Sequence, residues 1–417
     1  MDAENMETTF FQKTEFDRLL TAMLASEEGI SDLLFIAGKP PQVETHGSLE
    51  SYSATAPVLE SSQVETFARS IIRDNPKLMK DLTERGSCDC SYALNDSRFR
   101  VNIYKQNGSF AMVLRRLQSA IPEMDALGAP KILHEVIKEK NGLVFVTGGT
   151  GTGKTTTLAS MLGEVNRSHK FHIVTLEDPI EFLHPHLQCT FSQRELGKDF
   201  FTFPDGLRAA LRQAPKVIFV GEIRDRETME IALTAGETGH VVYSTLHTIS
   251  AGQTINRIIG MFDKDEEKLV RERLSATLRY VISQRLAPKK GSGRLLVSEV
   301  MGSSLRTREA IEMGENENRR LHDIIEAGQS AGWHSFEQSL LKAFENNLIT
   351  EETAMQYCTN RSAMRQRLDT SKSKRGSRPA PSSVKGSMIS VGPAAPPVTL
   401  QMSSPAAPPP VIGMANS

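Results

Sequence analysis

The clearest chemical pattern in this 417-residue sequence is a glycine-rich loop that ends in a lysine and a threonine. Its residues, GGTGTGKT from Gly148 to Thr155, fit the pattern GxxxxGK followed by Ser or Thr, and lie between the apolar run LVFVT and a helical run. Such glycines let backbone N–H groups curl around phosphates, and the helix N-terminus adds partial positive charge. Lys154 can then reach the β- and γ-phosphates, and the Thr155 hydroxyl can bind Mg²⁺. The residues predicted to surround a bound nucleotide are Gly148, Gly149, Thr150, Gly151, Thr152, Gly153, Lys154, Thr155 and Thr156.

Carboxylates follow two later apolar runs, where an enzyme that transfers a phosphoryl group needs acids to hold a metal ion and to handle the attacking water. The run VIFV is followed by Glu222, which resembles a Walker B acid although Asp is commoner there. The run HIVTL is followed by Glu177 and Glu181, and we expect Glu181 on a turn where it can face a γ-phosphate. Acids at strand ends also cap helices, but two such clusters after a phosphate loop favour a catalytic site.

Histidines flank the apolar run VVYST, with His240 before it and His247 after it. A lone histidine is more often structural than catalytic. His247 lies at the C-terminal end of a predicted strand beside the phosphate loop, so it is the better candidate for sensing a phosphate.

A parallel sheet would bring these groups together. Between residues 141 and 300, short apolar runs alternate with helical stretches, which is the pattern of a buried parallel sheet covered by helices. The predicted fold class is therefore α/β. The pattern also predicts a helix from Pro130 to about Lys140, one long amphipathic helix over Lys264–Arg285 and a late strand over Arg294–Val300.

Composition shifts divide the chain into five segments. The stretch after Thr370 holds 9 of the 20 prolines and no acid, which is typical of a disordered tail. The expected segments are an α+β domain over residues 1–120, a linker and leading helix over 121–140, the P-loop core over 141–300, a helical subdomain over 301–369 and a tail rich in Ser, Ala and Pro over 370–417.

Charge and composition exclude several classes of protein. Five basic residues and no acid follow Asp369, so residues 1–369 hold 44 basic against 50 acidic side chains, which is the wrong balance for a dedicated nucleic-acid binder. No apolar run approaches the roughly 18 to 20 residues that cross a bilayer, and the acidic N-terminus does not resemble a signal peptide. We therefore expect a cytoplasmic protein, whose four cysteines are reduced and bind no metal.

Four motifs in order closely resemble the hexameric secretion-superfamily ATPases and, within them, the type IV pilus retraction (PilT/PilU-like) motors. They are GGTGTGKTTTLA at 148–159, IVTLEDPIEF at 173–182, LRQAPKVIFVGEIRDRETM at 211–229 and AGETGHVVYSTLHT at 235–248. The stretches ISDLLFIAGKPP (30–41) and RFRVNIYKQNG (98–108) extend the resemblance into the first domain.

The resemblance implies an N-terminal PAS-like domain, a RecA-like P-loop domain and a ring of six subunits that hydrolyses ATP to drive pilus retraction in twitching motility. It implies that Glu181 is the catalytic base and that Glu222 is the Walker B acid, which shares Mg²⁺ with Thr155. His247, and second to it His240, would couple the nucleotide state to subunit movement. The arginine-finger candidates, which would complete the site from the first domain, are Arg98, Arg100 and Arg115.

The resemblance also implies partners: an inner-membrane platform protein, which would hold the motor at the cytoplasmic face of that membrane, and a possible second, paralogous pilus ATPase.

Differences between this sequence and the family's motifs keep alternative functions open. The segment that aligns with the family's AIRN-like motif reads SSLRT at 303–307, and RQAP and EIRDRETM resemble the accessory PilU-type paralogue. Remaining alternatives are an accessory or assembly ATPase, a nucleotide-dependent scaffold without turnover and, most distantly, a nucleic-acid translocase.

Overall fold

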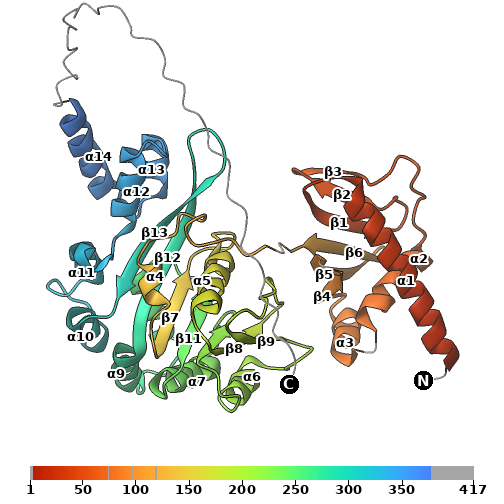
Figure 1. Ribbon diagram of the computed structural model, residues 1–417, viewed down its shortest axis with the longest axis horizontal. Coiled ribbons are helices and arrows are strands. Elements are labelled where there is room, and N and C mark those ends of the chain that lie inside the picture. Colours follow the sequence, from red (N-terminus) through yellow and green to blue (C-terminus); the bar gives the residue numbers. More distant parts are fainter. Residues whose placement is uncertain (1–2, 74, 96, 118–119, 377–417) are drawn as a thin grey trace, which may run out of the picture. The chain divides into compact units, whose positions relative to one another are not determined.

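The computed structural model describes residues 3–73, 75–95, 97–117 and 120–376 (Figure 1). Residues 1–371 belong to one compact unit. Within the described part of the chain, no helix has the length and apolar character needed to cross a membrane.

The N-terminal part consists of one antiparallel sheet with three helices. Its six strands lie in the order β3-β2-β1-β6-β5-β4, and its apolar core gathers Phe16 of the first helix, Phe35 of the first strand and Phe67 of the second helix, whose rings contact one another. The elements are α1 (Ala3–Ser26), β1 (Ile30–Ile36), β2 (Gln42–Thr45), β3 (Ser48–Ser51), α2 (Ser61–Ile72), α3 (Pro76–Glu84), β4 (Ser87–Leu94), β5 (Ser97–Gln106) and β6 (Ser109–Arg116).

The second sheet has seven strands in the order β13-β12-β7-β11-β10-β8-β9, and only the pair β12–β13 runs antiparallel. This mixed sheet with helices on both faces confirms the predicted α/β class. Its elements are α4 (Leu133–Val136), β7 (Gly142–Thr147), α5 (Lys154–Ser168), β8 (His172–Glu177), β9 (Thr190–Glu195), α6 (Phe203–Ala210), β10 (Val217–Val220), α7 (Arg226–Glu237), β11 (Val241–Leu246), α8 (Ala251–Ile259), α9 (Glu267–Thr277), β12 (Leu278–Pro288) and β13 (Arg294–Gly302).

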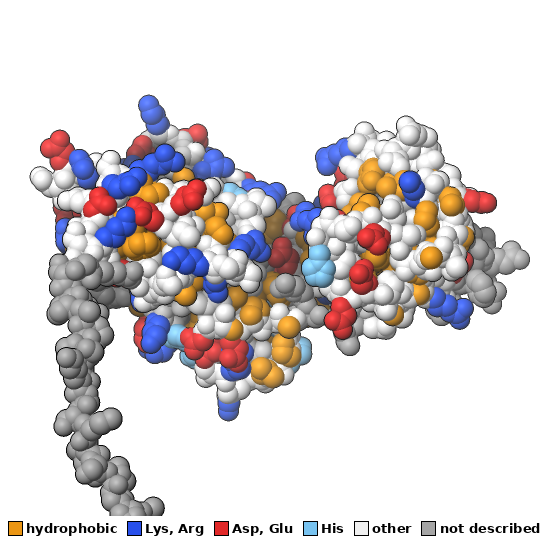
Figure 2. Space-filling model, turned by 90° about the horizontal axis from the view of Figure 1, so that it is seen from above, with side chains coloured by type: hydrophobic (Ala, Val, Ile, Leu, Met, Phe, Trp, Pro, Cys, Tyr) orange, Lys and Arg blue, Asp and Glu red, His pale blue; other side chains and the backbone are white. Residues whose placement is uncertain are grey.

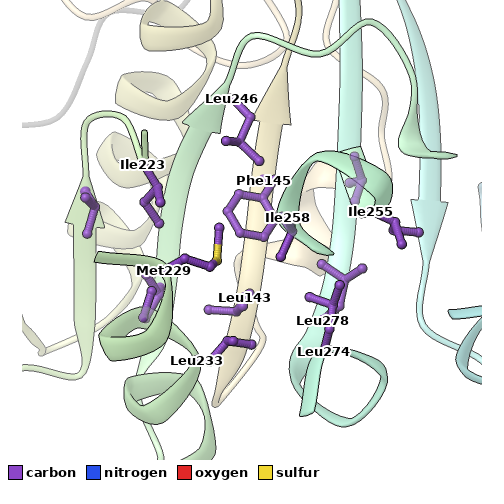
Figure 3. Close-up of a cluster of buried hydrophobic side chains, with 14 of the residues drawn as sticks. Leu143, Phe145, Ile223, Met229, Leu233, Leu246, Ile255, Ile258, Leu274 and Leu278 are labelled. Carbon is purple, nitrogen blue, oxygen red and sulfur yellow. The ribbon is translucent and has the colours of Figure 1, made fainter. Parts of the chain in front are cut away.

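The two faces of the central strand β7 enter different apolar clusters because side chains alternate along a strand. Leu143 and Phe145 pack with α7, α8 and α9, as Figure 3 shows for Met229 and Ile258. The alternate residues of β7 pack with α4 and α5 on the other face. Every residue of β7 is buried, so the apolar run LVFVT has a core on both sides.

Helices follow the second sheet: α10 (Leu305–Met313), α11 (Leu321–Ala327), the short 3-10 helix η1 (Gln329–Ala331), α12 (Phe336–Glu345), α13 (Glu351–Tyr357) and α14 (Arg361–Gly376). Arg285 of β12 joins these helices to the sheet. Its guanidinium lies 3.8 Å from the ring centroid of Phe336 and donates hydrogen bonds to the Tyr357 carbonyl and the Thr359 hydroxyl.

The structure corrects three expectations. The long helix predicted over Lys264–Arg285 is wrong beyond Thr277, because Leu278 begins β12, which pairs with β7 on one side and β13 on the other. The helix expected from Pro130 shortens to Leu133–Val136. The start expected for the tail, residue 370, is wrong because α14 continues to Gly376. The rest of that expected segment, residues 377–417, lies outside the described residues.

Candidate nucleotide-binding site

The glycine-rich loop connects β7, which ends at Thr147, to α5, which begins at Lys154. Gly153 is the N-cap of α5 with φ 83°, a left-handed conformation that glycine adopts at no steric cost. A Cβ atom at Gly148 would lie 2.6 Å from the carbonyl oxygen of Gln284 on β12. Glycine is therefore required here both for backbone conformation and for close approach to a neighbouring strand.

Lys154 lies across the loop with its side chain mostly buried. Its Nζ donates hydrogen bonds to the carbonyl oxygens of Gly148 (3.0 Å) and Gly149 (2.9 Å). Burial lowers the pKa of the ammonium, and the nearby carboxylates of Glu222 and Glu181 oppose that effect. The structure therefore brings the phosphate-loop lysine and the two predicted acids into one electrostatic neighbourhood.

Parallel pairing explains why residues far apart in sequence meet at this edge. Strands β7, β11, β10 and β8 are parallel neighbours, so their C-terminal ends lie at the same edge of the sheet. The phosphate loop, His247, Glu222 and Glu177 each follow or end one of these four strands. An open parallel sheet binds ligands at this edge.

Glu222 is held by two neighbours. Its Oε2 accepts a hydrogen bond from Arg224 Nη2 at 2.7 Å, and its Oε1 lies 3.5 Å from His247 Nε2. Partial burial raises the pKa of this carboxyl, but the hydrogen bond and charge of Arg224, with the charges of His247 and Lys154, bring the pKa below its usual range. Glu222 is thus an ionised carboxylate beside the loop, and His247 is in contact with it.

His240 is not brought to this site. It precedes the N-terminal end of β11, where its carbonyl accepts a hydrogen bond from Gly142 N at 2.9 Å. Its ring Nδ1 lies 3.1 Å from the Ala235 carbonyl oxygen. The two histidines that flank one strand therefore occupy opposite edges of the sheet, and only His247 contacts a predicted acid.

Two further acids, Glu177 and Glu181, lie at the end of β8 and in the connection between β8 and β9. Glu181 is half-buried on this connection, and its charge acts on Lys154. Glu177 at the end of β8 is buried, and its Oε1 accepts a hydrogen bond from Thr175 Oγ1 at 2.6 Å. Burial raises the pKa of Glu177 to about 7, and the nearby Glu181 carboxylate adds to that rise, although its hydrogen bonds oppose it.

The three arginines predicted to complete the site differ in their surroundings. Arg98 donates to Glu195 Oε2 at 3.0 Å, and both side chains are largely buried. Arg115 donates to Asp32 at 2.9 Å across the β1–β6 pair, but 69 % of its side chain stays exposed. Arg100 is exposed on β5. Arg98 is therefore already paired within this chain, whereas Arg100 and Arg115 have exposed side chains.

Two glutamines that support the site were not predicted from the sequence. Gln284 of β12 is buried and donates to the Thr152 carbonyl at 2.8 Å, so it supports the phosphate loop from the neighbouring strand. Gln193 of β9 bonds the connection that carries Glu181. Gln284 lay in a segment expected to be helical, and β9 was not expected, so neither residue had a pattern that could identify it.

The family model described as "Type II/IV secretion system protein" matches residues 91–355 of this chain. The Pseudomonas aeruginosa type IV pilus retractation ATPase PilT is 40 % identical over 338 residues, covering 80 % of this chain and 96 % of that protein. The type IV pilus ATPase PilU of the same organism is 35 % identical, covering 84 % of this chain and 90 % of its own length.

A solved structure of the pilus retraction motor PilT with bound ADP resembles this fold with a TM-score of 0.76. The two chains are 38 % identical, and the likeness covers 84 % of this chain and 98 % of the other. The similarity therefore extends through both sheets rather than the phosphate loop alone.

Proposed function

The chain belongs to the type II/IV secretion system protein family, and on that premise we propose that it is a hexameric ATPase that powers type IV pilus retraction. The observation that carries the proposal is the edge of the parallel sheet, where the phosphate loop and Glu222 follow parallel strands and the charges of Glu222 and Glu181 act on Lys154. Similarity to PilT over almost the whole of that protein's length supports retraction as the output.

The chemistry we propose is hydrolysis of ATP to ADP and phosphate. Lys154 would bind the β- and γ-phosphates and stabilise the charge that builds on the transferred phosphoryl group. Glu181 would take a proton from the attacking water, as the general base. Glu222 and its neighbour His247 would respond to the γ-phosphate, because loss of that charge changes the field at both side chains.

Mg²⁺ fits the residues at this edge. The Thr155 hydroxyl and the Glu222 carboxylate are the hard oxygen ligands that Mg²⁺ prefers, and Glu222 is kept ionised by Arg224. When bound, the ion would neutralise phosphate charge.

We further propose that the N-terminal domain is PAS-like, that the core is RecA-like, and that the first domain completes the site of a neighbouring subunit. Arg100 and Arg115 suit the arginine-finger role because both side chains are exposed, whereas Arg98 is paired with Glu195. The subunit would act at the cytoplasmic face of the inner membrane through a platform protein of the pilus machine.

An accessory, PilU-like role is the second candidate, because the chain is also 35 % identical to PilU over 90 % of that protein. A role in moving nucleic acid is not proposed. On the face seen in Figure 2, Lys and Arg side chains lie among Asp and Glu side chains rather than in one basic stripe.

The test is steady-state ATP hydrolysis across a range of protein concentrations, with wild type titrated by the Glu181→Gln variant. Specific activity should rise with concentration, and the variant should inhibit wild type more than its mole fraction, because sites are shared between subunits. Absence of turnover at every concentration would favour the accessory role. Retraction of labelled pili in a strain that lacks the gene, restored by wild type but not by Lys154→Ala, tests the output.

A further inference from the structure

Four polar side chains stand on one face of the sheet beneath the connection that carries Glu181. Strands β8 and β9 pair in parallel, with Thr175 opposite Gln193 and Glu177 opposite Glu195. Side chains two residues apart share a face of a strand, so all four point to the same side. Polar groups placed together this deeply need partners, since an unpaired buried polar group costs about 1–3 kcal/mol.

The side-chain amide of Gln193 forms hydrogen bonds with the β8–β9 connection and with Glu177. Its Nε2 donates to the Phe182 carbonyl oxygen at 2.8 Å and to Glu177 Oε1 at 3.3 Å. Its Oε1 accepts from the backbone N–H of His184 at 2.8 Å. The Gln193 side chain therefore holds the backbone at Phe182 and His184, which lie one and three residues after Glu181.

The N-terminal side of the connection is fixed from the same face. The backbone N–H of Glu181 bonds to Glu177, and the backbone N–H of Ile180 lies 3.4 Å from Glu195 Oε2. Backbone groups on both sides of Glu181 thus bond to side chains of β8 and β9. The ring of His184 adds an apolar contact, stacked on Phe191 of β9 with centroids 4.5 Å apart.

We propose that Gln193 and Glu177 are positioning residues, which hold the backbone around Glu181 so that its carboxylate stays beside the phosphate loop. This inference rests on the proposed function, in which Glu181 is the catalytic base. A base must lie within hydrogen-bond reach of the proton it removes, and a misplacement of about 1 Å can cost about 10²-fold in rate. Gln193 touches neither Lys154 nor Glu222 in this structure, so it acts through the backbone.

The test replaces the amide with an apolar side chain of similar size, in the variant Gln193→Leu. We expect kcat for ATP hydrolysis to fall on the order of 10- to 100-fold, with the Kd for ATP changed less than about 3-fold, because the phosphate loop keeps its own contacts. The matched control is Gln188→Leu, an exposed glutamine in the same β8–β9 connection, which should keep wild-type kcat.

A double-mutant cycle separates positioning from a general loss of structure. In the Glu181→Gln background, adding Gln193→Leu should change the single-turnover rate less than about 2-fold, since the group being positioned has lost its function. An equally large fall in both backgrounds, or a parallel loss of ATP affinity, would overturn the proposal. So would a Gln193→Leu rate equal to that of the control.

Gln193→Glu keeps the inference testable if Gln193→Leu does not fold. This variant keeps the acceptor for His184 N–H but loses the donor to the Phe182 carbonyl and faces the Glu177 carboxylate, so kcat should fall by a similar factor. Failure of the two ideas can be told apart. Full activity in Glu181→Gln would contradict the proposed base itself, whereas a normal Glu181 effect with unchanged Gln193 variants would contradict the positioning alone.

Discussion

The two sheets of this chain place their charged side chains differently. In the N-terminal sheet each neighbouring pair of strands runs antiparallel, and polar partners meet directly across it, as Arg115 meets Asp32 and Asn102 meets Asp89. In the second sheet parallel strands end at one edge, where Lys154 and Glu222 gather. Antiparallel pairing thus places Arg115 and Asn102 directly opposite an acidic partner on the neighbouring strand. Parallel pairing brings side chains of opposite charge together at one edge of the sheet, where they can bind a ligand.

The largest effect on ATP turnover should come from removing Lys154, the cation at the C-terminal edge of the parallel sheet. Lys154→Ala should lower ATP turnover by about 10³-fold or more, because the γ-phosphate loses its main positive partner. Hydrolysis assays at saturating ATP, with nucleotide binding measured in parallel, check this. Lys105→Ala, an exposed lysine of β5 in the antiparallel sheet, is the control and should keep wild-type turnover. Wild-type activity in Lys154→Ala would contradict the assignment of the loop.

The next effect concerns the base at the same edge. Glu181→Gln should keep ATP bound but lower kcat on the order of 10²-fold or more, since the amide cannot accept the proton. Single-turnover hydrolysis with an equilibrium Kd for ATP separates the two quantities. An unchanged kcat would move the general base to Glu222 or to another group.

A smaller effect should appear in the pH dependence of stability. The pKa of Glu177 is raised to about 7 in the folded chain, so between about pH 4.5 and 7 the native state holds a proton that the unfolded state has released. The free energy of unfolding should therefore fall as pH rises through this window, by roughly 3 kcal/mol from this group, and level off above it. Denaturant unfolding at several pH values should show this slope in wild type and lack it in Glu177→Gln. Identical slopes in the two proteins would show that Glu177 is not responsible.

The smallest expected effect compares two arginines of the N-terminal part. Arg98→Ala should destabilise the chain by roughly 2 kcal/mol. This is less than the about 3–5 kcal/mol typical of a broken buried ion pair, because Lys198 and Ser91 still bind Glu195. Arg115→Ala should cost less than about 1 kcal/mol because its pair with Asp32 is largely exposed. Urea unfolding of both variants measures the difference, and a larger loss for Arg115 would contradict the comparison.

The sequence could predict the strands whose apolar runs are buried on both faces, and it could predict the phosphate loop from its motif. It could not predict β12. Leu278, Val281, Ile282 and Leu286 recur at helical spacing, and the segment forms a strand because β7 and β13 pair with it on both sides. Site residues that belong to a sequence motif could be predicted, but Gln193 and Gln284 belong to none and could not. Both act through bonds to distant backbone carbonyls, which leave no spacing in the sequence.

Adjacent residues of β12 have different partners: Gln284 bonds to the phosphate loop and Arg285 to the helices that follow the sheet. This alternation has a consequence for protein engineering. One residue inserted between positions 278 and 284 would exchange the faces of the two side chains and break both sets of contacts at once. The exposed turn that follows, Lys289–Gly293, closes on itself through the bond from Lys289 N to the Gly293 carbonyl. Lys290 of this turn also donates its backbone N–H to the Leu348 carbonyl oxygen at 2.8 Å, so a fluorophore or affinity tag inserted at Gly291 has to preserve that contact.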